Sequence, residues 1–138
     1  MYHHRKALKR YRSYPRPKSD ECHFCGKDQV AIVAETEHAR IIRNRVSYDV
    51  WELRKVVEHL MVIPKRHVTS LKDLDDAERN DIMKVIGDYE SQGYNIYARS
   101  AGNLMRSVPH QHTHLIKTAG RLAKLTFYLK KPYIFIKL

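Results

Sequence analysis

Several features are scarce in this 138-residue chain, and each scarcity excludes a class of protein. Only two cysteines occur, which is too few for a secreted domain held together by a disulfide framework. No apolar run approaches the ~20 residues that a membrane-spanning helix needs. The N-terminal residues lead into no apolar stretch, so we expect no secretory signal. These absences leave a cytoplasmic protein with no membrane segment, long enough for one packed domain.

Acidic residues are nearly missing from the two ends of the chain. Residues 1–20 hold seven lysines and arginines and one acidic residue, and residues 117–138 hold six and none. The stretch between them has thirteen basic and fourteen acidic residues, so the net charge of +11 belongs to the ends. Basic ends attract polyanions, which makes nucleic acid a candidate partner, although solubility alone would also explain them. We expect a basic N-terminal arm, residues 1–20, and a domain, residues 21–138.

Three histidines alternate with other residues in the stretch Ser107–Ile116, at His110, His112 and His114. On an extended strand, side chains two residues apart share a face, so the three imidazoles would point into one pocket. Neutral imidazoles grouped in this way have two chemical uses. They bind a metal such as zinc, or one of them attacks an electrophile while its neighbours fix its tautomer. An expression tag does not alternate deep inside a chain.

A second group of candidate metal ligands lies in the segment Cys22–Lys27. Two residues separate the thiols of Cys22 and Cys25, and Gly26 helps the backbone to reverse in a tight turn. This is the shape of a zinc knuckle, but zinc needs two further ligands, and two unpaired structural thiols have the same spacing. The candidates for the further ligands are His23, His38, His59, His67 and the three alternating histidines.

The hydrophobic pattern predicts an α+β fold. A helix over residues 75–92 is indicated by Asp75 at its N-cap, Glu78 at the capping-box position, and an apolar stripe of helical spacing that Gly93 ends. Residues Asp49–Val57 are predicted as a short helix. Apolar, β-branched runs predict strands, which we expect to form an antiparallel sheet of roughly five strands packed on the long helix. The predicted strands are Val30–Glu35, Ala39–Ile42, His59–Ile63, Tyr94–Ala98 and Ser107–Ile116, with two short ones at Lys124–Leu129 and Tyr133–Leu138.

Two segments in combination resemble a known family. Ser107-Val108 precedes the alternating histidines, and the segment His59-Leu60-Met61-Val62-Ile63-Pro64-Lys65-Arg66-His67-Val68 lies upstream. This combination resembles the histidine triad (HIT) family of nucleotide hydrolases and transferases, over about residues 22–116. The resemblance implies a HIT-like antiparallel sheet, a homodimer, and a nucleotide substrate such as a nucleoside phosphoramidate or a dinucleoside polyphosphate.

The resemblance also implies a role for each histidine. His112, the middle histidine of the triad, would attack the α-phosphorus and form a covalent nucleotidyl-histidine. His114 would hydrogen-bond the phosphate or the leaving group, and His59 would orient a triad imidazole. No catalytic metal is required for this chemistry. The residues implied to bind the nucleoside or the phosphate are Asn44, Arg99, Arg106, Ser107 and Val108.

The chain departs from the family pattern beside the triad. Met105-Arg106 stands where many members have Gly-Gln, and Arg99 lies near the position of a family asparagine. Arg106 could replace the glutamine with a charge-assisted phosphate contact, or it could be a surface arginine. Ser47 stands where one branch of the family has proline. These changes put the identity of the substrate in doubt more than the identity of the nucleophile.

A structural zinc site is a further implication of the resemblance. Some bacterial members carry a similar C-x-x-C turn and complete the site with histidines that correspond to His67 and His110. By that resemblance Cys22, Cys25, His67 and His110 hold zinc. A metal on His110 would exclude this residue as the nucleophile, which agrees with His112 in that role.

Two rival interpretations come from other classes of function. In the first, the three triad histidines hold a catalytic zinc, which would explain their spacing but not the segment His59–Val68. In the second, a zinc-stabilised fold with basic ends binds nucleic acid and the triad is vestigial. A combined alternative is a HIT protein that removes adenylate from nucleic-acid ends, since one branch of the family has this activity.

Overall fold

The computed structural model describes residues 9, 13, 22–26, 31–122, 126–130 and 133–137. The predicted basic arm, residues 1–20, lies almost entirely outside the described residues, and so do residues 27–30, where the first strand was expected to begin. No helix in the described part of the chain is long and apolar enough to cross a membrane.

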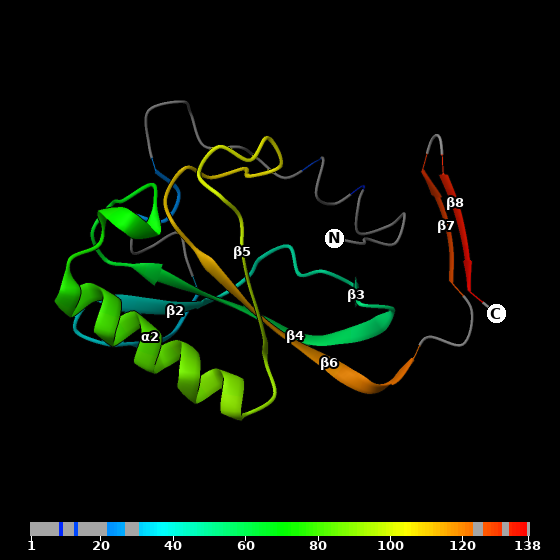
Figure 1. The fold of residues 1–138 in the computed structure, drawn as a ribbon, viewed down its shortest axis with the longest axis horizontal. Coiled ribbons are helices and arrows are strands. Elements are labelled where there is room, and N and C mark those ends of the chain that lie inside the picture. Colours follow the sequence, from blue (N-terminus) through cyan, green and yellow to red (C-terminus); the bar gives the residue numbers. More distant parts are fainter. Residues whose placement is uncertain are drawn as a thin grey trace.

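The domain is built on one antiparallel sheet (Figure 1). Its strands run in the order β1-β2-β4-β6-β5, and the short strand β3 pairs with β4 beside this path. Every described pairing in this sheet is antiparallel, which confirms the predicted α+β class and sheet type. The strands are β1 (Ile32–Glu35), β2 (Ala39–Arg43), β3 (Val50–Trp51), β4 (Arg54–Pro64), β5 (Asn95–Ala98) and β6 (Thr113–Leu122).

The helix α2 (Asp76–Ser91) packs against strands β2, β4, β5 and β6, after a short 3-10 helix η2 (Leu71–Asp73). Asp75 caps the helix, because its carboxylate accepts a hydrogen bond from the Glu78 backbone N–H while the Glu78 carboxylate accepts one from the Asp75 N–H. Gly93 follows with a φ of +86°, which glycine adopts without steric cost. The predicted helix and both of its end signals are confirmed.

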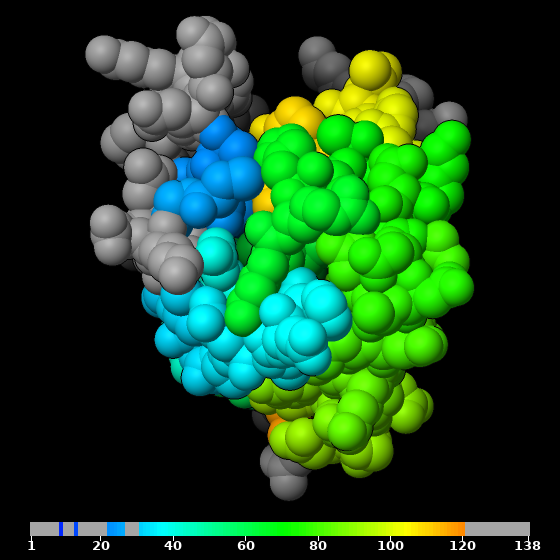
Figure 2. Space-filling view, turned by 90° about the vertical axis from the view of Figure 1, so that its left-hand side faces the viewer, coloured from blue at the N-terminus to red at the C-terminus, as the bar shows by residue number. Residues whose placement is uncertain are grey.

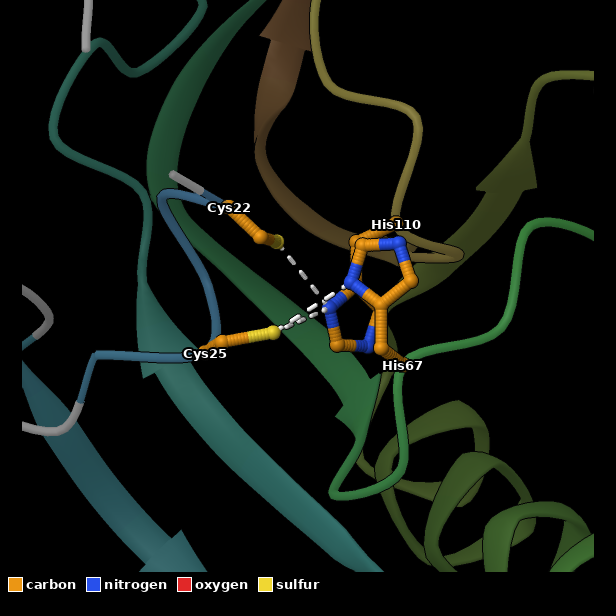
Figure 3. A group of neighbouring side chains, drawn as sticks. All are labelled: Cys22, Cys25, His67 and His110. Carbon is orange, nitrogen blue, oxygen red and sulfur yellow. Dashed lines mark hydrogen bonds between the residues drawn. The ribbon is translucent and has the colours of Figure 1, made fainter. Parts of the chain in front are cut away.

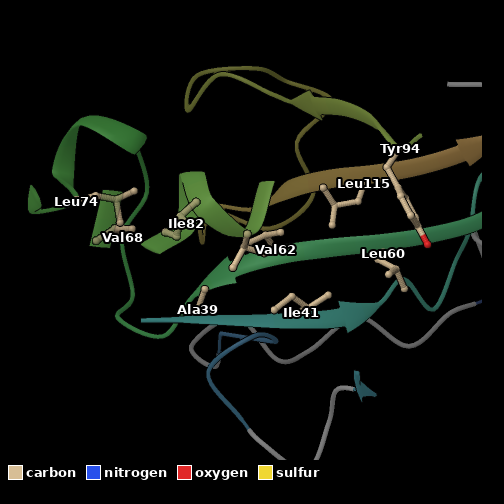
Figure 4. Packing of buried hydrophobic residues seen from close by; sticks show 10 residues of the cluster. Ala39, Ile41, Leu60, Val62, Val68, Leu74, Ile82, Tyr94 and Leu115 are labelled. Carbon is tan, nitrogen blue, oxygen red and sulfur yellow. The ribbon is translucent and has the colours of Figure 1, made fainter. Parts of the chain in front are cut away.

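The main hydrophobic core lies between α2 and one face of the sheet (Figure 4). Leu60 and Val62 of β4 point toward the helix, where Leu115 of β6 and Ile82 of α2 meet them. Burial of each such side chain contributes ~1.5–3 kcal/mol. The period of a strand is two residues, so His59, the neighbour of Leu60, lies on the opposite face. The alternation in β4 therefore separates a packing face from a face that can carry chemistry.

The predicted short helix over residues 49–57 is wrong. Val50–Trp51 forms β3, Glu52 and Leu53 form a two-residue turn, and β4 begins at Arg54 rather than at His59. Both turn residues have positive φ values, 48° and 60°, as a tight hairpin requires. The cause is the β-branched residues on both sides of the turn, Val50, Val56 and Val57, which favour extended backbone over helix.

The predicted triad strand also begins later than expected. Strand β6 starts at Thr113, so His110 and His112 lie in the loop before it and only His114 lies in the strand. Pro109 has no N–H to offer a sheet, and the Gln111 N–H donates to the Val68 carbonyl instead of to a neighbouring strand, at 2.7 Å. The two short C-terminal strands are confirmed as an antiparallel pair, β7 (Thr126–Lys130) and β8 (Tyr133–Lys137).

Candidate functional site

The face of the sheet that points away from α2 carries a continuous series of aromatic rings. Neighbouring ring centroids in this series lie 4.6, 6.1, 5.3, 5.1 and 5.1 Å apart. In spatial order, the ring series is His67, His110, Phe24, His112, His114 and His59. The three triad histidines therefore share one row although two of them precede the strand, because the Phe24 ring packs against both His110 and His112.

Hydrogen bonds at one end of the ring series assign the tautomers of two histidines. The Tyr48 backbone N–H donates to His59 Nδ1 at 3.1 Å, so in a neutral ring the proton lies on Nε2. His59 Nε2 then donates to His114 Nδ1 at 2.9 Å. The remaining proton of His114 therefore lies on Nε2, a buried atom with no hydrogen-bond partner among the described residues. His114 therefore presents an N–H donor beside His112.

The predicted nucleoside residue Asn44 is part of the same arrangement. Its side-chain amide nitrogen lies 3.3 and 3.2 Å from the two ring nitrogens of His59. Its side-chain oxygen accepts the Val46 backbone N–H at 3.1 Å. The backbone N–H of Asn44 donates to the His59 carbonyl at 3.0 Å. Asn44 therefore ties the chain after β2 to His59.

His112 has the geometry of a nitrogen nucleophile. Its Nδ1–H donates to the backbone carbonyl of His110 at 2.8 Å, which leaves the lone pair of Nε2 unused by any described residue. Burial lowers the pKa of His112, and the charges of Arg106 and Arg99 lower it further. Burial and the neighbouring His59 lower the pKa of His114 to about 2. Both imidazoles are therefore neutral at neutral pH, the form in which Nε2 of His112 can attack.

The other end of the ring series is a Cys/His group (Figure 3). Cys22 and Cys25 point from their turn toward the two imidazoles, and the four ligand atoms lie within 4.8 Å of one another. Cys22 Sγ lies 3.3 Å from His110 Nδ1, and Cys25 Sγ lies 3.3 Å from His67 Nδ1 and 3.6 Å from His110 Nδ1. Figure 2 shows this turn (blue) at the surface, beside the segments that carry the two histidines (green and orange).

The chemistry of this group fits a tetrahedral metal ion. Zinc with its usual bond lengths to sulfur and nitrogen sets neighbouring S and N ligands roughly 3.6 Å apart, close to the observed separations. His110 Nε2–H donates to the Pro64 carbonyl at 3.0 Å, so the lone pair of Nδ1 faces the thiols. Burial and the nearby His67 lower the pKa of His110 to about 4, which keeps this ring neutral. The four residues that the resemblance implied for zinc are thus brought together as a group that could hold a metal.

Arg106 lies in the loop that leads to the triad, where its guanidinium binds the protein itself. Its Nε donates to the Val108 carbonyl at 3.1 Å and its Nη1 to the Thr69 carbonyl at 2.8 Å. Its Nη2 donates to the Pro109 carbonyl at 2.6 Å and to Gln111 Oε1 at 3.2 Å. These bonds occupy four of the five N–H groups that an arginine has, so little is left for a bidentate phosphate contact.

The other predicted phosphate residues lie around the triad without forming one cluster. The guanidinium of Arg99 lies over the ring of Tyr97, 5.6 Å from its centroid, and its charge reaches both His112 and His114. Val108 packs on the cluster that contains Phe24, and Ser107 is exposed. Among the predicted phosphate residues, Arg99 is the one whose charge acts on both His112 and His114.

Sequence reasoning missed several aromatic residues at this site. Tyr48 lies 4.4 Å from the His59 ring, and Trp51 lies 5.9 Å from Tyr48 and 5.1 Å from Tyr97, centroid to centroid. Phe24 separates the rings of His110 and His112. The sequence predicts the strand that contains Tyr97, but only the structure shows that Tyr97 pairs with His114 of β6. The sequence gives no signal for Trp51, because the pattern of residues 49–57 predicts a helix and not the hairpin that places this ring.

Comparison with known proteins agrees with this geometry. The family model described as the HIT domain matches residues 29–120. An adenosine 5′-monophosphoramidase, HNT1, from Candida albicans is 26% identical over 108 residues, which are 69% of this chain and 68% of that protein.

Solved structures share the fold at lower identity. A HIT family hydrolase from Clostridium thermocellum has a TM-score of 0.55 and 22% identity over 78% of this chain and 98% of its own. A hypothetical protein from Leishmania major has a TM-score of 0.58 and 23% identity over 88% and 86%. The family model covers most of the chain and includes the triad together with the upstream strand that carries His59. On this evidence the chain belongs to the HIT family.

Proposed function

We propose that the protein is a nucleotidyl hydrolase or transferase that uses Nε2 of His112 as its nucleophile. The observation that carries this proposal is the bond from His112 Nδ1–H to the His110 carbonyl, 2.8 Å long, in a site where both His112 and His114 are neutral. A nitrogen with a free lone pair and a fixed tautomer is the feature that covalent catalysis by histidine requires.

The reaction proceeds in two displacement steps. Nε2 of His112 forms a bond to the α-phosphorus of a nucleotide while the bond from phosphorus to the leaving nitrogen or oxygen breaks, and the leaving atom takes a proton from solvent. Water then attacks the phosphorus of the nucleotidyl-histidine, which releases a nucleoside monophosphate and returns His112 to its neutral state. A phosphoryl centre gains charge during each step, so nearby donors stabilise the transition state.

The donors around His112 fit this requirement. His114 carries a buried Nε2–H with no partner among the described residues, and a phosphoryl oxygen is an acceptor that would satisfy it. Arg99 supplies positive charge, since its field reaches both His112 and His114. Ser107 adds a hydroxyl and a backbone N–H. These residues position and stabilise the phosphate, and none of the proposed steps is carried by a metal.

The substrate class that we propose is a nucleoside phosphoramidate, with a dinucleoside polyphosphate as the second choice. The name of the Candida albicans relative, an adenosine 5′-monophosphoramidase, favours the first. The Cys/His group would hold a structural zinc, because Cys₂His₂ is a common donor set for that metal. That zinc would fix the turn of Cys22 and Cys25 to the loop that begins the triad.

We also propose a cytoplasmic homodimer. Strand β5 ends the sheet, and no described strand pairs with its outer edge. An open edge has backbone N–H and C=O groups that a second copy of the chain can pair with.

A second candidate function is supported by the charge at the two ends of the chain. Residues 1–20 and 117–138 each carry a net charge of +6, while the stretch between them is nearly neutral. Such ends suit contact with nucleic-acid phosphates. The alternative is therefore removal of adenylate from nucleic-acid ends by the same triad.

The test is turnover of adenosine 5′-phosphoramidate by the wild-type protein, followed by chromatography of released AMP. Intact-protein mass spectrometry at neutral pH should detect a nucleotidyl adduct during turnover. His112→Ala should abolish the adduct and lower AMP release at least about 1,000-fold, since a nucleophile is lost. His38→Ala is the matched control, because this histidine lies outside the ring series, and it should turn over at the wild-type rate.

The same assay separates the two candidate functions. A 5′-adenylated oligonucleotide that releases AMP faster than the phosphoramidate would favour the nucleic-acid-end reaction. Full activity of His112→Ala, or no release of nucleotide from either substrate, would reject the proposed function.

A further inference from the structure

The turn of residues 22–26 holds its two thiols as a preformed pair. The Cys25 backbone N–H donates to the Cys22 carbonyl at 3.1 Å, which closes the turn, and Arg40 of β2 donates to the Phe24 carbonyl at 3.4 Å. The sulfurs of Cys22 and Cys25 lie within 4.8 Å of each other (Figure 3). The chain itself therefore keeps the two thiols together, whether or not a metal is bound.

A turn of this kind also allows the two sulfurs to form a covalent bond. The hydrogen bond from Cys25 back to Cys22 is that of a four-residue turn, in which the first and last Cα atoms lie less than about 7 Å apart, and a disulfide spans ~4.4–6.8 Å between its Cα atoms. Cys25 is exposed and Cys22 is half-buried, so an oxidant in solution reaches Cys25 first. The pair thus has one thiol that can be attacked from solution and a neighbour that can complete the reaction.

The same turn acts on the triad by two routes. The Phe24 ring, which comes from between the two cysteines, lies 5.3 Å from the His112 ring, centroid to centroid. His110 Nδ1 lies 3.3 Å from Cys22 Sγ and 3.6 Å from Cys25 Sγ, and the His110 carbonyl accepts the Nδ1–H bond that fixes the tautomer of His112. A change in the bonding of the thiols is therefore felt by the residue that carries the proposed nucleophile.

We propose that Cys22 and Cys25 are an oxidation site, at which a hydroperoxide converts the two thiols into a disulfide and thereby lowers the activity of the triad reversibly. The oxidation itself is independent of the proposed function, whereas its effect on activity rests on that function. An S–S bond of ~2.0 Å draws the sulfurs toward each other and changes their contacts with the rings of His67 and His110. Only these two imidazoles then remain as donors, half of a tetrahedral set, so the disulfide form should not retain a metal.

The oxidation takes place in two steps. The Cys25 sulfur attacks one oxygen of the hydroperoxide, the O–O bond breaks, and the other oxygen leaves as water or an alcohol with the thiol proton, so that Cys25 becomes a sulfenic acid. The Cys22 sulfur then attacks the Cys25 sulfur, the S–O bond breaks, and water leaves with the proton of the second thiol. The two thiols lose two electrons in total, and the hydroperoxide gains both.

The test is treatment of the reduced wild-type protein with a small molar excess of hydrogen peroxide, followed by N-ethylmaleimide labelling in urea and intact-protein mass spectrometry. The reduced protein should take two labels. The treated protein should take none, weigh less by two hydrogen atoms, and regain both labels after reduction with dithiothreitol. Met83 and Met105 are exposed and give an internal scale, because dithiothreitol does not reduce their sulfoxides. Thiols that still take label once these methionines are oxidised, or that go on to acids which dithiothreitol does not reverse, would overturn the proposal.

Two single variants test which thiol reacts first. Cys22→Ser keeps the exposed thiol, and Cys25→Ser keeps the half-buried one. Dimedone, which traps sulfenic acids, should label peroxide-treated Cys22→Ser several-fold faster than Cys25→Ser. Equal labelling of the two variants, or faster labelling of Cys25→Ser, would contradict the roles assigned to the two thiols.

The effect on the triad is measured as AMP release from adenosine 5′-phosphoramidate. Oxidation of the wild-type protein should release its zinc into the filtrate and lower kcat roughly tenfold, the scale of a small displacement of a reacting group, and dithiothreitol with zinc should restore the rate. The double variant Cys22→Ser, Cys25→Ser is the matched control: whatever its starting rate, peroxide should leave that rate unchanged. An unchanged rate in the oxidised wild type, or an equal loss in the double variant, would reject the link to the triad. If the reduced wild-type protein releases no AMP, the proposed function has failed, while the labelling result still decides the oxidation site.

Discussion

Arg106 illustrates how a single side chain can serve a site without touching the substrate. Its guanidinium joins four acceptors, three of them backbone carbonyls: three acceptors lie beside the triad, at Val108, Pro109 and Gln111, and the fourth is the Thr69 carbonyl in the loop after β4. The loop ends at His110 and His112, which no sheet pairing holds in place. Arg106 therefore holds the loop of His110 and His112 in place, as pairing within the sheet does for His114.

We expect Arg106→Ala to lower kcat about tenfold or more and to change KM little, because the loop that positions His112 loses its brace. Arg106→Lys should not restore the rate, since one ammonium group cannot reach acceptors that point in four directions. The measurement is steady-state kinetics on adenosine 5′-phosphoramidate.

A direct contact between Arg106 and the substrate phosphate would give a different kinetic result. If Arg106 binds phosphate directly, KM should rise in Arg106→Ala, and lysine should restore much of the loss. Arg99→Ala is the comparison, because Arg99 is the basic residue whose charge reaches both His112 and His114.

At the scale of single residues, the sequence predicts the reacting groups better than their contacts. The spacing of the three triad histidines pointed to a shared pocket. The pairing of Cys22 and Cys25 with His67 and His110 came only through family resemblance, because these residues are far apart in the chain and spacing cannot select among nine histidines. The bond from Asn44 to His59 depends on a turn after β2 that no local pattern encodes.

At the scale of elements, the sequence predicts a helix or strand correctly where the signals for that element lie within its own residues. The capping residues and apolar stripe of α2 are contained in its own sequence, and the helix forms as predicted. The hairpin within residues 49–57 is harder to predict, because its β-branched residues favour strands but Glu52 and Leu53 are not residues that usually form a two-residue turn with positive φ. Hydrogen bonds between β3 and β4 in the sheet offset the unfavourable backbone conformation of this turn.

The cap of α2 also holds the loop that carries His67. Arg66 Nε donates to Glu78 Oε1 at 2.8 Å, and Arg66 also donates to the Asp73 carbonyl at 2.8 Å. The bond to Arg66 lowers the pKa of the Glu78 carboxyl from 4.5 to about 2. A folded-state pKa below the unfolded value stabilises the protein above pH 4.5, and this stabilisation is lost as the pH falls toward 2.

We therefore expect Glu78→Gln to lower the free energy of unfolding by about 1–2 kcal/mol at pH 7, and this deficit should shrink as the pH falls below 4.5. The measurement is urea unfolding of both proteins at several pH values. Only the difference in free energy of unfolding between the two proteins is interpreted, because other carboxylates titrate in the same pH range. Asp76→Asn, an exposed carboxylate in the same helical turn, should show a smaller deficit. A deficit in Glu78→Gln that does not depend on pH would contradict the ionic role of Glu78.

At the scale of the whole molecule, the Cys/His group and the reacting histidine share one residue. The His110 side chain faces the thiols through Nδ1. Its backbone carbonyl oxygen accepts a hydrogen bond from the Nδ1–H of His112, with 2.8 Å between nitrogen and oxygen. The turn that carries the thiols is also held from β2, where Arg40 donates to the Phe24 carbonyl at 3.4 Å. A metal in this group would tie the turn of residues 22–26, the loop after β4 and the start of the triad into one unit.

We expect the protein purified without a histidine tag to contain one zinc ion per chain by elemental analysis. The double variant Cys22→Ser, Cys25→Ser should lose this zinc and unfold about 5–10 °C lower, because binding free energy is stability that only the folded state gains. His23→Ala is the matched control: it lies in the same turn but outside the four-residue group, so it should keep both the zinc and the melting temperature. Zinc at full stoichiometry in the double variant would reject this site, and so would its absence from the wild-type protein. Melting curves separate these outcomes from a loss of catalysis, since they report the metal's effect on the fold whether or not any substrate is turned over.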